Sequence, residues 1–282
     1  MAPDGALFDV ASMTVSSDEE YYAIFKLVED VRKVVHPEWF TIVNNNFTYD
    51  EHAVLPGSDY YTSGLSICPA VKLKGKITIP RYINGYPVVS LVDFDTLEQE
   101  ITHVFMEHSD EESGRAPLTV IQYECFNDVD TLKYFDFTNS NIRYVESGGF
   151  RRCSLDPSIN RLDLAPLQVV GPRGFNQGFT FTEATTLLIP SCLKRVSENG
   201  FTNLFTYPGS TLQIGTQEVF SDLDLGQGIN GNNYKQFAQN NPFKYIYFYS
   251  NLYDDETDIV KDNYTVAQCL GAVAEGGSYS II

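Results

Sequence analysis

The sequence of 282 residues has few basic residues for its number of acidic ones, and only one tryptophan. It contains 19 lysines and arginines against 37 aspartates and glutamates, so the formal net charge is -18. Phosphate binding depends on Lys and Arg side chains that release counterions, so this imbalance argues against a nucleic-acid groove. It argues against binding to an anionic membrane surface for the same reason. We interpret the acidity as a property that keeps a tyrosine-rich surface soluble.

Long apolar runs and paired cysteines are also missing. No run of 18 apolar residues is present, so we expect no membrane-spanning helix. The N-terminal residues lack a basic region followed by an apolar one, so we expect no secretory signal peptide. The five cysteines include no C-x-x-C pair, which favours reduced structural thiols over disulfides or a metal site. They are Cys68, Cys125, Cys153, Cys192 and Cys269.

Catalytic motifs are absent as well, and three partial matches are weak. Gly226–Gly231 matches G-x-G-x-x-G but lacks the strand before it and the helix after it. The same stretch, read from Asp222, resembles a calcium loop but has Asn233 where glutamate is needed. His103–His108 is one residue off an inverted zincin motif, on a predicted strand where His and Glu cannot share one face. We therefore expect no enzyme activity, no cofactor and no metal.

The sequence does contain an internal repeat between Leu118 and Asn203. Four times, an aliphatic residue is followed three positions later by Val or Ile, and five positions after that by Phe. The sets are Leu118/Ile121/Phe126, Ile142/Val145/Phe150, Leu167/Val170/Phe175 and Leu193/Val196/Phe201. The phenylalanines recur at intervals of 24, 25 and 26 residues. This period is typical of a solenoid, whose units bury their apolar faces by stacking, and it predicts one column of phenylalanines.

Apolar pairs with the same period predict a ladder of stacked strands. They are Val104/Met106, Phe135/Phe137, Leu162/Leu164 and Leu187/Ile189. Alternation along a strand sends both members of a pair inward and the residue between them outward. The residue before the repeat Phe is Gly149, Gly174, Gly200 or Cys125. We expect a small residue there to let the backbone of one coil approach the ring of the next.

The repeat pattern resembles the BspA-like class of leucine-rich repeats. The pattern is Leu-x-x-Ile-x-Ile-Pro, a turn, Leu-x-x-Ile-x-x-x-x-Phe and then Cys or Asn. Leu132–Cys153 and Ala184–Asn203 match it best, and Ile77–Pro80 with Asn84–Val88 is similar to its common opening. The resemblance covers about residues 74–220. It implies a right-handed solenoid with little helix, used for adhesion or protein recognition, and it supplies no catalytic residues.

The regions outside the repeats are predicted to cap the solenoid. Ser17–Glu20 is a helix N-cap with acids in the first turn, and Pro37 ends the helical spacing, so we expect an amphipathic capping helix over about 18–35. The expected fold is mainly β, with this helix before the solenoid and an irregular C-terminal extension after it. The expected divisions are 1–70, 71–225 and 226–282. The apolar tail at 266–282 should lie against the last rung or insert into a neighbour.

The outward positions of the ladder are the candidate protein-binding residues. They are Lys76, Thr78, His103, Phe105, Tyr134, Asp136, Arg161, Asp163, Thr186, Leu188 and Gln213. Solenoids generally bind along the ladder face, and this mixture of residue types is typical of interfaces. A solvated sheet face that binds nothing explains the same mixture equally well.

Two hypotheses for the function follow from these patterns. The first is a non-enzymatic structural or interaction component of a larger assembly, such as a virus or phage particle. The second is a surface adhesin or host-recognition module, which would place the chain at a cell surface. Both predict protein partners, and neither involves nucleic acid or membrane insertion. An enzyme is the least favoured alternative.

Overall fold

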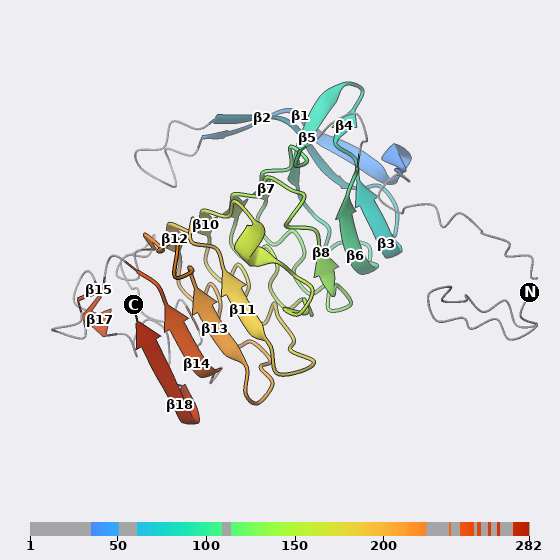
Figure 1. Cartoon of the computed structure of the whole chain (residues 1–282). Coiled ribbons are helices and arrows are strands. Elements are labelled where there is room, and N and C mark those ends of the chain that lie inside the picture. Colours follow the sequence, from blue (N-terminus) through green and yellow to red (C-terminus); the bar gives the residue numbers. More distant parts are fainter. Residues whose placement is uncertain are drawn as a thin grey trace, which may run out of the picture. The chain divides into compact units, whose positions relative to one another are not determined.

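The computed structural model describes most of the chain from residue 35 onward, and this part contains no α-helix (Figure 1). The described residues are 35–50, 61–108, 114–223, 237, 243–250, 253–254, 259–260, 264–265 and 273–281. The helix predicted over 18–35 lies outside these residues, apart from Val35, which is not helical. Cys68, Cys125, Cys153 and Cys192 are free thiols, and Cys269 lies outside the described residues.

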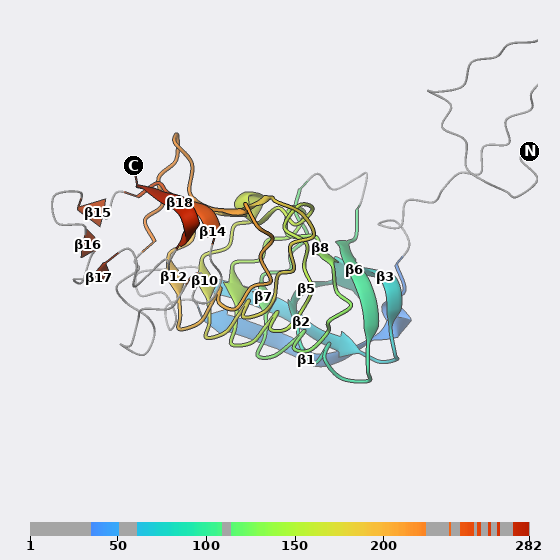
Figure 2. The same ribbon diagram turned by 90° about the horizontal axis from the view of Figure 1, so that it is seen from below.

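The described chain is a parallel β-solenoid of about 6 turns, with corresponding positions about 26 residues apart. Figure 2 shows the turns as loops stacked side by side. The predicted ladder is present in two parts, which we call the ladder sheet. Its first part is β3 (Lys74–Ile79), β6 (Glu100–Met106) and β8 (Tyr134–Phe135). Its second part is β11 (Thr186–Ile189), β13 (Thr211–Ile214), β14 (Phe243–Phe248) and β18 (Val273–Ile281).

A second sheet runs along another side of the same turns. In spatial order its strands are β1 (Phe40–Asp50), β2 (Tyr61–Pro69), β5 (Tyr86–Leu91), β7 (Val120–Ile121), β9 (Tyr144–Val145), β10 (Val169–Val170) and β12 (Arg195–Val196). The short strand β4 (Tyr82–Ile83) pairs with β5. From β2 onward, neighbours along this order are parallel. The Val or Ile of each repeat triplet therefore belongs to a strand of its own, which the sequence analysis did not separate from the ladder.

The two sheets enclose a core whose central feature is a column of phenylalanine rings. Phe126, Phe150, Phe175 and Phe201 lie in one file, with successive ring centroids 5.3, 5.2 and 4.9 Å apart. Their successive ring planes differ by only 1 to 9°. The predicted column is therefore confirmed. It extends by one ring at each end, to Phe94 at 4.9 Å and to Phe237 at 5.1 Å.

The ladder strands supply the opposite side of the core. Ile77, Val104 and Phe135 are in register on β3, β6 and β8, and all three are buried. The ring of Phe135 meets Phe126 and Phe150 edge-on, at 78° and 76°. Edge-to-face contacts of this kind are preferred between aromatic rings because a positive ring edge faces a negative ring face. The apolar pairs and the phenylalanine column thus form one continuous core.

The small residue before each repeat Phe has a different cause from the one predicted. A Cβ at Gly174 would lie 2.6 Å from Cγ1 of Val170, and one at Gly200 would lie 2.4 Å from Cγ1 of Val196. Both valines precede the glycine by four residues in the same coil. The nearest obstacle is therefore the β-branched residue of the same turn. The prediction that the glycine accommodates the ring of the next coil was wrong.

The ladder sheet is interrupted where the sequence predicted the strand pair Leu162/Leu164. Leu162–Leu164 is a 3-10 turn, η5, in which Leu162 is buried and Leu164 is exposed. Ala165 is extended, with ψ of 147°, as expected for a residue that precedes proline. The side chain of Asn160 takes over the missing strand's pairing: its Oδ1 accepts from N of Phe135 at 3.0 Å and its Nδ2 donates to O of Lys133 at 2.8 Å.

The described N-terminal end of the core is covered by a short segment before β1. The 3-10 turn η3 (Pro37–Trp39) leads into Phe40, which is buried and whose ring lies 6.2 Å from Phe94. Trp39 packs partly buried against the same core and stacks on His36 at 4.1 Å. Among the described residues, the aromatic side chains of Trp39 and Phe40 therefore cover this end of the phenylalanine column.

The hairpin formed by β1 and β2 also covers part of the second sheet's outer side. Val120, Tyr144 and Val169 form a small buried cluster there, and Phe47 and Tyr49 of β1 pack against it. The rings of Tyr49 and Tyr144 are 4.7 Å apart. Strands β1 and β2 belong to the N-terminal region 1–70, which was predicted to cap the solenoid. Their position over the second sheet was not predicted.

The C-terminal region is more regular than predicted where it is described. Strand β14 continues the ladder after β13, and β18 pairs with β14 in parallel. Residues 273–281 of the apolar tail therefore lie against the preceding rung, which was one of the two expected arrangements. A separate antiparallel sheet is formed by β15 (Tyr253–Asp254), β16 (Ile259–Val260) and β17 (Tyr264–Thr265).

Candidate functional site

The predicted outward residues form rows across the ladder sheet, and we call this surface the ladder face. In the first part, Lys76, His103 and Tyr134 are in register on neighbouring strands, and Thr78 is beside Phe105. In the second part, Thr186 of β11 is beside Thr211 and then Tyr245, and Leu188 is beside Gln213 and then Tyr247. The η5 turn, which carries Asp163, separates the two parts (Figure 1).

Two predicted surface residues are buried, which corrects their assignment to the exposed face. Thr78 is 5% exposed and Asp136 is 1% exposed. Strand β8 ends at Phe135, so Asp136 lies in the following turn, where its Oδ1 accepts from N of Asn139 at 3.2 Å and from Nδ2 at 2.9 Å. A short Asp side chain that binds the backbone three residues on stabilises a turn. Asp136 is therefore a structural residue and is unavailable to a partner.

The first part of the ladder face carries a cluster of three aromatic side chains, which we call the aromatic triad. His103, Phe105 and Tyr134 are all half-buried, and their ring centroids lie 5.2 to 6.0 Å from one another. Burial lowers the pKa of His103, and the nearby ammonium groups of Lys76 and Lys133 lower it further. The triad is thus a partly desolvated surface with positive charge beside it.

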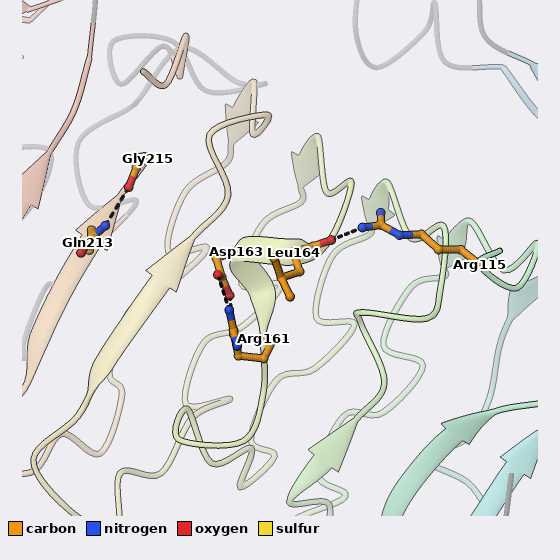
Figure 3. Close-up of polar contacts among 6 residues, drawn as sticks. All are labelled: Arg115, Arg161, Asp163, Leu164, Gln213 and Gly215. Carbon is orange, nitrogen blue, oxygen red and sulfur yellow. Dashed lines mark hydrogen bonds and ion pairs between the residues drawn. The ribbon is translucent and has the colours of Figure 1, made fainter. Parts of the chain in front are cut away.

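The centre of the ladder face is polar. Arg161 binds Asp163 through two parallel hydrogen bonds, from Nε to Oδ1 at 3.0 Å and from Nη2 to Oδ2 at 2.9 Å (Figure 3). The hydrogen bond to Asp163 raises the pKa of Arg161. Arg115 reaches the same turn and donates to the carbonyl of Leu164 (Figure 3). Exposed pairs of this kind contribute about 0–1 kcal/mol to stability, so they orient the surface more than they stabilise the fold.

The second part of the ladder face is largely uncharged. Gln213 donates from Nε2 to the carbonyl of Gly215 at 3.1 Å (Figure 3). Its register partner Leu188 and the nearby Thr186 are half-exposed. Tyr245 and Tyr247 follow on β14, with ring centroids 6.4 Å apart, and Nζ of Lys244 lies 6.0 Å from the Tyr245 ring. The sequence analysis missed these tyrosines. The signal that could have identified them is the apolar pair Ile246/Phe248, which is spaced like the other ladder pairs and leaves Tyr245 and Tyr247 at the outward positions.

The residues of the near-match to a zincin motif serve other purposes. The Nδ1 atom of His103 lies 3.0 Å from Oγ1 of Thr102, and Oε2 of Glu107 accepts from N of Arg81 at 2.7 Å. Across the described ranges, no group of three or more His, Cys, Asp or Glu side chains is placed to hold a metal ion. The stretch weighed as a dinucleotide or calcium loop lies outside those ranges, apart from Asp222 and Leu223.

Comparisons with known proteins do not assign the chain to a family, so the chain is classified by its fold alone. No protein-family model, no curated protein and no solved structure matches it. Within the described part of the chain, no helix is both long enough and apolar enough to cross a bilayer. The chain is therefore defined by its architecture, a parallel β-solenoid with a half-exposed ladder face.

Proposed function

We propose that this chain is a non-enzymatic binding scaffold, of the BspA-like leucine-rich-repeat type, that recognises protein partners through its ladder face. The observation that carries the proposal is the contrast between the two sides of each ladder strand. The inward residues of the ladder strands are uniformly apolar and buried, whereas the outward residues vary from rung to rung and, apart from Thr78 and Asp136, are half-buried or exposed. Such a surface presents different side chains in fixed positions, which suits recognition of another protein.

The composition of the ladder face supports a protein partner in particular. Aromatic residues and arginine are enriched at protein interfaces, and the face offers the aromatic triad, Arg161 and the tyrosines of β14. The preorganised backbone reduces the entropy that binding must overcome. The C-terminal strand β18, paired to β14, gives the solenoid a further edge through which it could join an assembly.

We propose a component of a larger assembly, such as a virus or phage particle, as the setting for this recognition. The net charge of -18 keeps a tyrosine-rich surface soluble, and solubility is what it contributes to an extracellular or particle-borne role. A surface adhesin uses the same ladder face and differs in what displays the chain. The two settings are distinguished by the partner: a copurifying particle protein supports the first, and a host-surface protein supports the second.

The test is a comparative capture experiment with the full chain. Wild type, the double variant Tyr134→Ala with Arg161→Ala, and the control Tyr123→Ala are used to capture proteins from the source of the chain. Tyr123 is 60% exposed but lies on a turn away from the ladder strands. A partner retained by wild type and by the control, and lost from the folded double variant, supports the proposal. A partner retained equally by all three would overturn it.

A further inference from the structure

We propose that the first part of the ladder face is a docking site for an acidic segment of a partner protein that carries an aromatic or aliphatic side chain between its carboxylates. This inference rests on the proposed function and specifies the partner's chemistry. The site consists of the aromatic triad of His103, Phe105 and Tyr134 together with Lys76 and Lys133. Lys76 lies on β3, His103 and Phe105 lie on β6, and Tyr134 lies on β8. Lys133 directly precedes β8.

Among the described residues, Lys76 and Lys133 differ from Lys72, Lys74 and Lys194 in their ion pairing. Lys72 and Lys74 form ion pairs with Glu100, at 2.8 and 2.9 Å, and Lys194 forms one with Asp222 at 2.5 Å. Lys76 and Lys133 are exposed, and neither forms an ion pair with any of the residues that the structure describes.

The positions of these charges match an acidic, partly apolar ligand. Lys76 is in register with His103 on the neighbouring strand, and N of Lys133 donates to O of Thr102 at 2.9 Å, so both lysines lie beside the triad. Asp136, the acid of the same face, is buried and occupied by Asn139. Two ammonium groups that have no ion-pair partner among the described residues lie beside three half-buried rings, and they favour carboxylates next to an apolar side chain, because each part of the ligand then meets its complement.

The charge of the whole chain favours a short acidic segment over an extended polyanion. A nucleic acid or a sulfated glycan would bring many charges over a molecule with a net charge of -18, and most of them would meet repulsion. A segment with two or three carboxylates needs only the local positive charge of Lys76 and Lys133. Interactions beyond roughly 8 Å are largely screened at physiological salt, so the local charges dominate for such a ligand.

The second part of the ladder face provides an internal comparison. Its outward rows contain Thr186, Thr211, Leu188 and Gln213, which carry no charge. Its lysine, Lys244, is half-buried near the ring of Tyr245. The proposal therefore predicts that acidic segments bind the first part of the ladder face. The acids of such a segment should not strengthen its binding to the second part.

The experiment is a peptide-display selection on the full-length chain with a random library of twelve-residue peptides. Three targets are used in parallel: wild type, the double variant Lys76→Gln with Lys133→Gln, and the control Lys244→Gln. Because both substituted lysines are exposed, we expect the double variant to keep the melting temperature of wild type. Peptides enriched on wild type are then synthesised, and their affinity is measured against the three targets and against Tyr134→Ala.

The expected result is enrichment of peptides with two or more acids around an aromatic or aliphatic residue. Their affinity should fall on the order of tenfold for the double lysine variant and at least about tenfold for Tyr134→Ala, with no change for Lys244→Gln. Enriched peptides without acids, equal affinity for wild type and the lysine variant, or no enrichment at all would overturn the inference. Tighter binding of heparin or of a single-stranded oligonucleotide than of the acidic peptides would overturn it too.

The experiment also separates this inference from the proposed function. Peptides that bind independently of Lys76 and Lys133 but are lost with Gln213→Ala or Tyr247→Ala would contradict the acidic docking site. They would still support the ladder face as a protein-binding surface. Peptides insensitive to every substitution on the ladder face would contradict both.

Discussion

The interior of the solenoid and its ladder face are built on the same turns, yet they place opposite demands on the sequence. In the interior, each inner ring of the phenylalanine column contacts an equivalent ring on either side of it, so every turn needs the same residue. On the ladder face, the neighbours of a side chain include solvent, so each turn carries a different residue. The repeated residues of the core therefore serve folding. The residues of the ladder face differ from turn to turn, and these differences can determine which partner is recognised.

The largest effect in this comparison is expected from removing one ring of the column. Phe175→Ala should lower the free energy of unfolding by about 3–5 kcal/mol, because the cavity is lined by rings that cannot collapse into it. Phe175 lies between Phe150 and Phe201 and also contacts Phe179 at 5.4 Å. Urea unfolding measures the change. The control Phe205→Ala removes a ring that is 58% exposed and should change stability by less than about 0.5 kcal/mol.

A smaller effect is expected from filling the space before a column ring. Gly174→Ala should cost about 1–3 kcal/mol, because its Cβ would lie 2.6 Å from Cγ1 of Val170. A double-mutant cycle with Val170→Ala identifies the cause. If the overlap with Val170 is responsible, the alanine at position 174 should cost markedly less in the Val170→Ala background. Equal costs in both backgrounds would point to the next coil instead, as the sequence analysis supposed.

The contact between the β1–β2 hairpin and the second sheet is expected to be weaker again. A double-mutant cycle between Tyr49 and Tyr144, each changed to Ala, should give a coupling energy of about 0.5–1.5 kcal/mol for rings 4.7 Å apart. Thermal or urea unfolding of the four proteins measures it. A coupling near zero would mean that the hairpin covers the sheet without stabilising it.

These differences explain how much of the fold could be read from the sequence. The column and the ladder pairs were predictable because neighbouring turns repeat the same contact, so the period itself carries the information. The hairpin over Tyr144 could not be predicted, since its contacts with the second sheet join residues that are distant in the sequence and have no period. The η5 turn was missed for a similar reason: Asn160 replaces a strand by side-chain hydrogen bonds, and an isolated Asn carries no periodic signal.

The candidate site was predictable in outline and wrong in detail. Alternation placed nine of the eleven named residues on a side that is at least partly exposed, whereas Thr78 and Asp136 are buried. It failed for Asp136, because β8 is only two residues long and the strand pattern no longer applies beyond it. It also gave no measure of charge pairing, which is what distinguishes Lys76 and Lys133 from Lys72, Lys74 and Lys194.

The smallest effect concerns the pH dependence of the ladder face. The pKa of His103 is lowered from 6.5 in the folded chain, chiefly by burial and then by Lys76 and Lys133. The unfolded chain therefore binds the proton first, so stability is full above pH 6.5 and falls as the pH drops through the window below it. His103→Asn should remove this small loss between pH 7 and pH 5, as measured by urea unfolding. An identical pH dependence in wild type and variant would show that His103 does not contribute.

The most direct test of the account measures stability and binding on the same two proteins, Phe175→Ala and the double variant Tyr134→Ala with Arg161→Ala. We predict that the first loses about 3–5 kcal/mol of stability and that the second loses far less while losing its captured partner. This outcome would separate a folding column from a recognition face. An unchanged free energy of unfolding for Phe175→Ala, or partner capture by the double variant equal to that of wild type, would contradict the account.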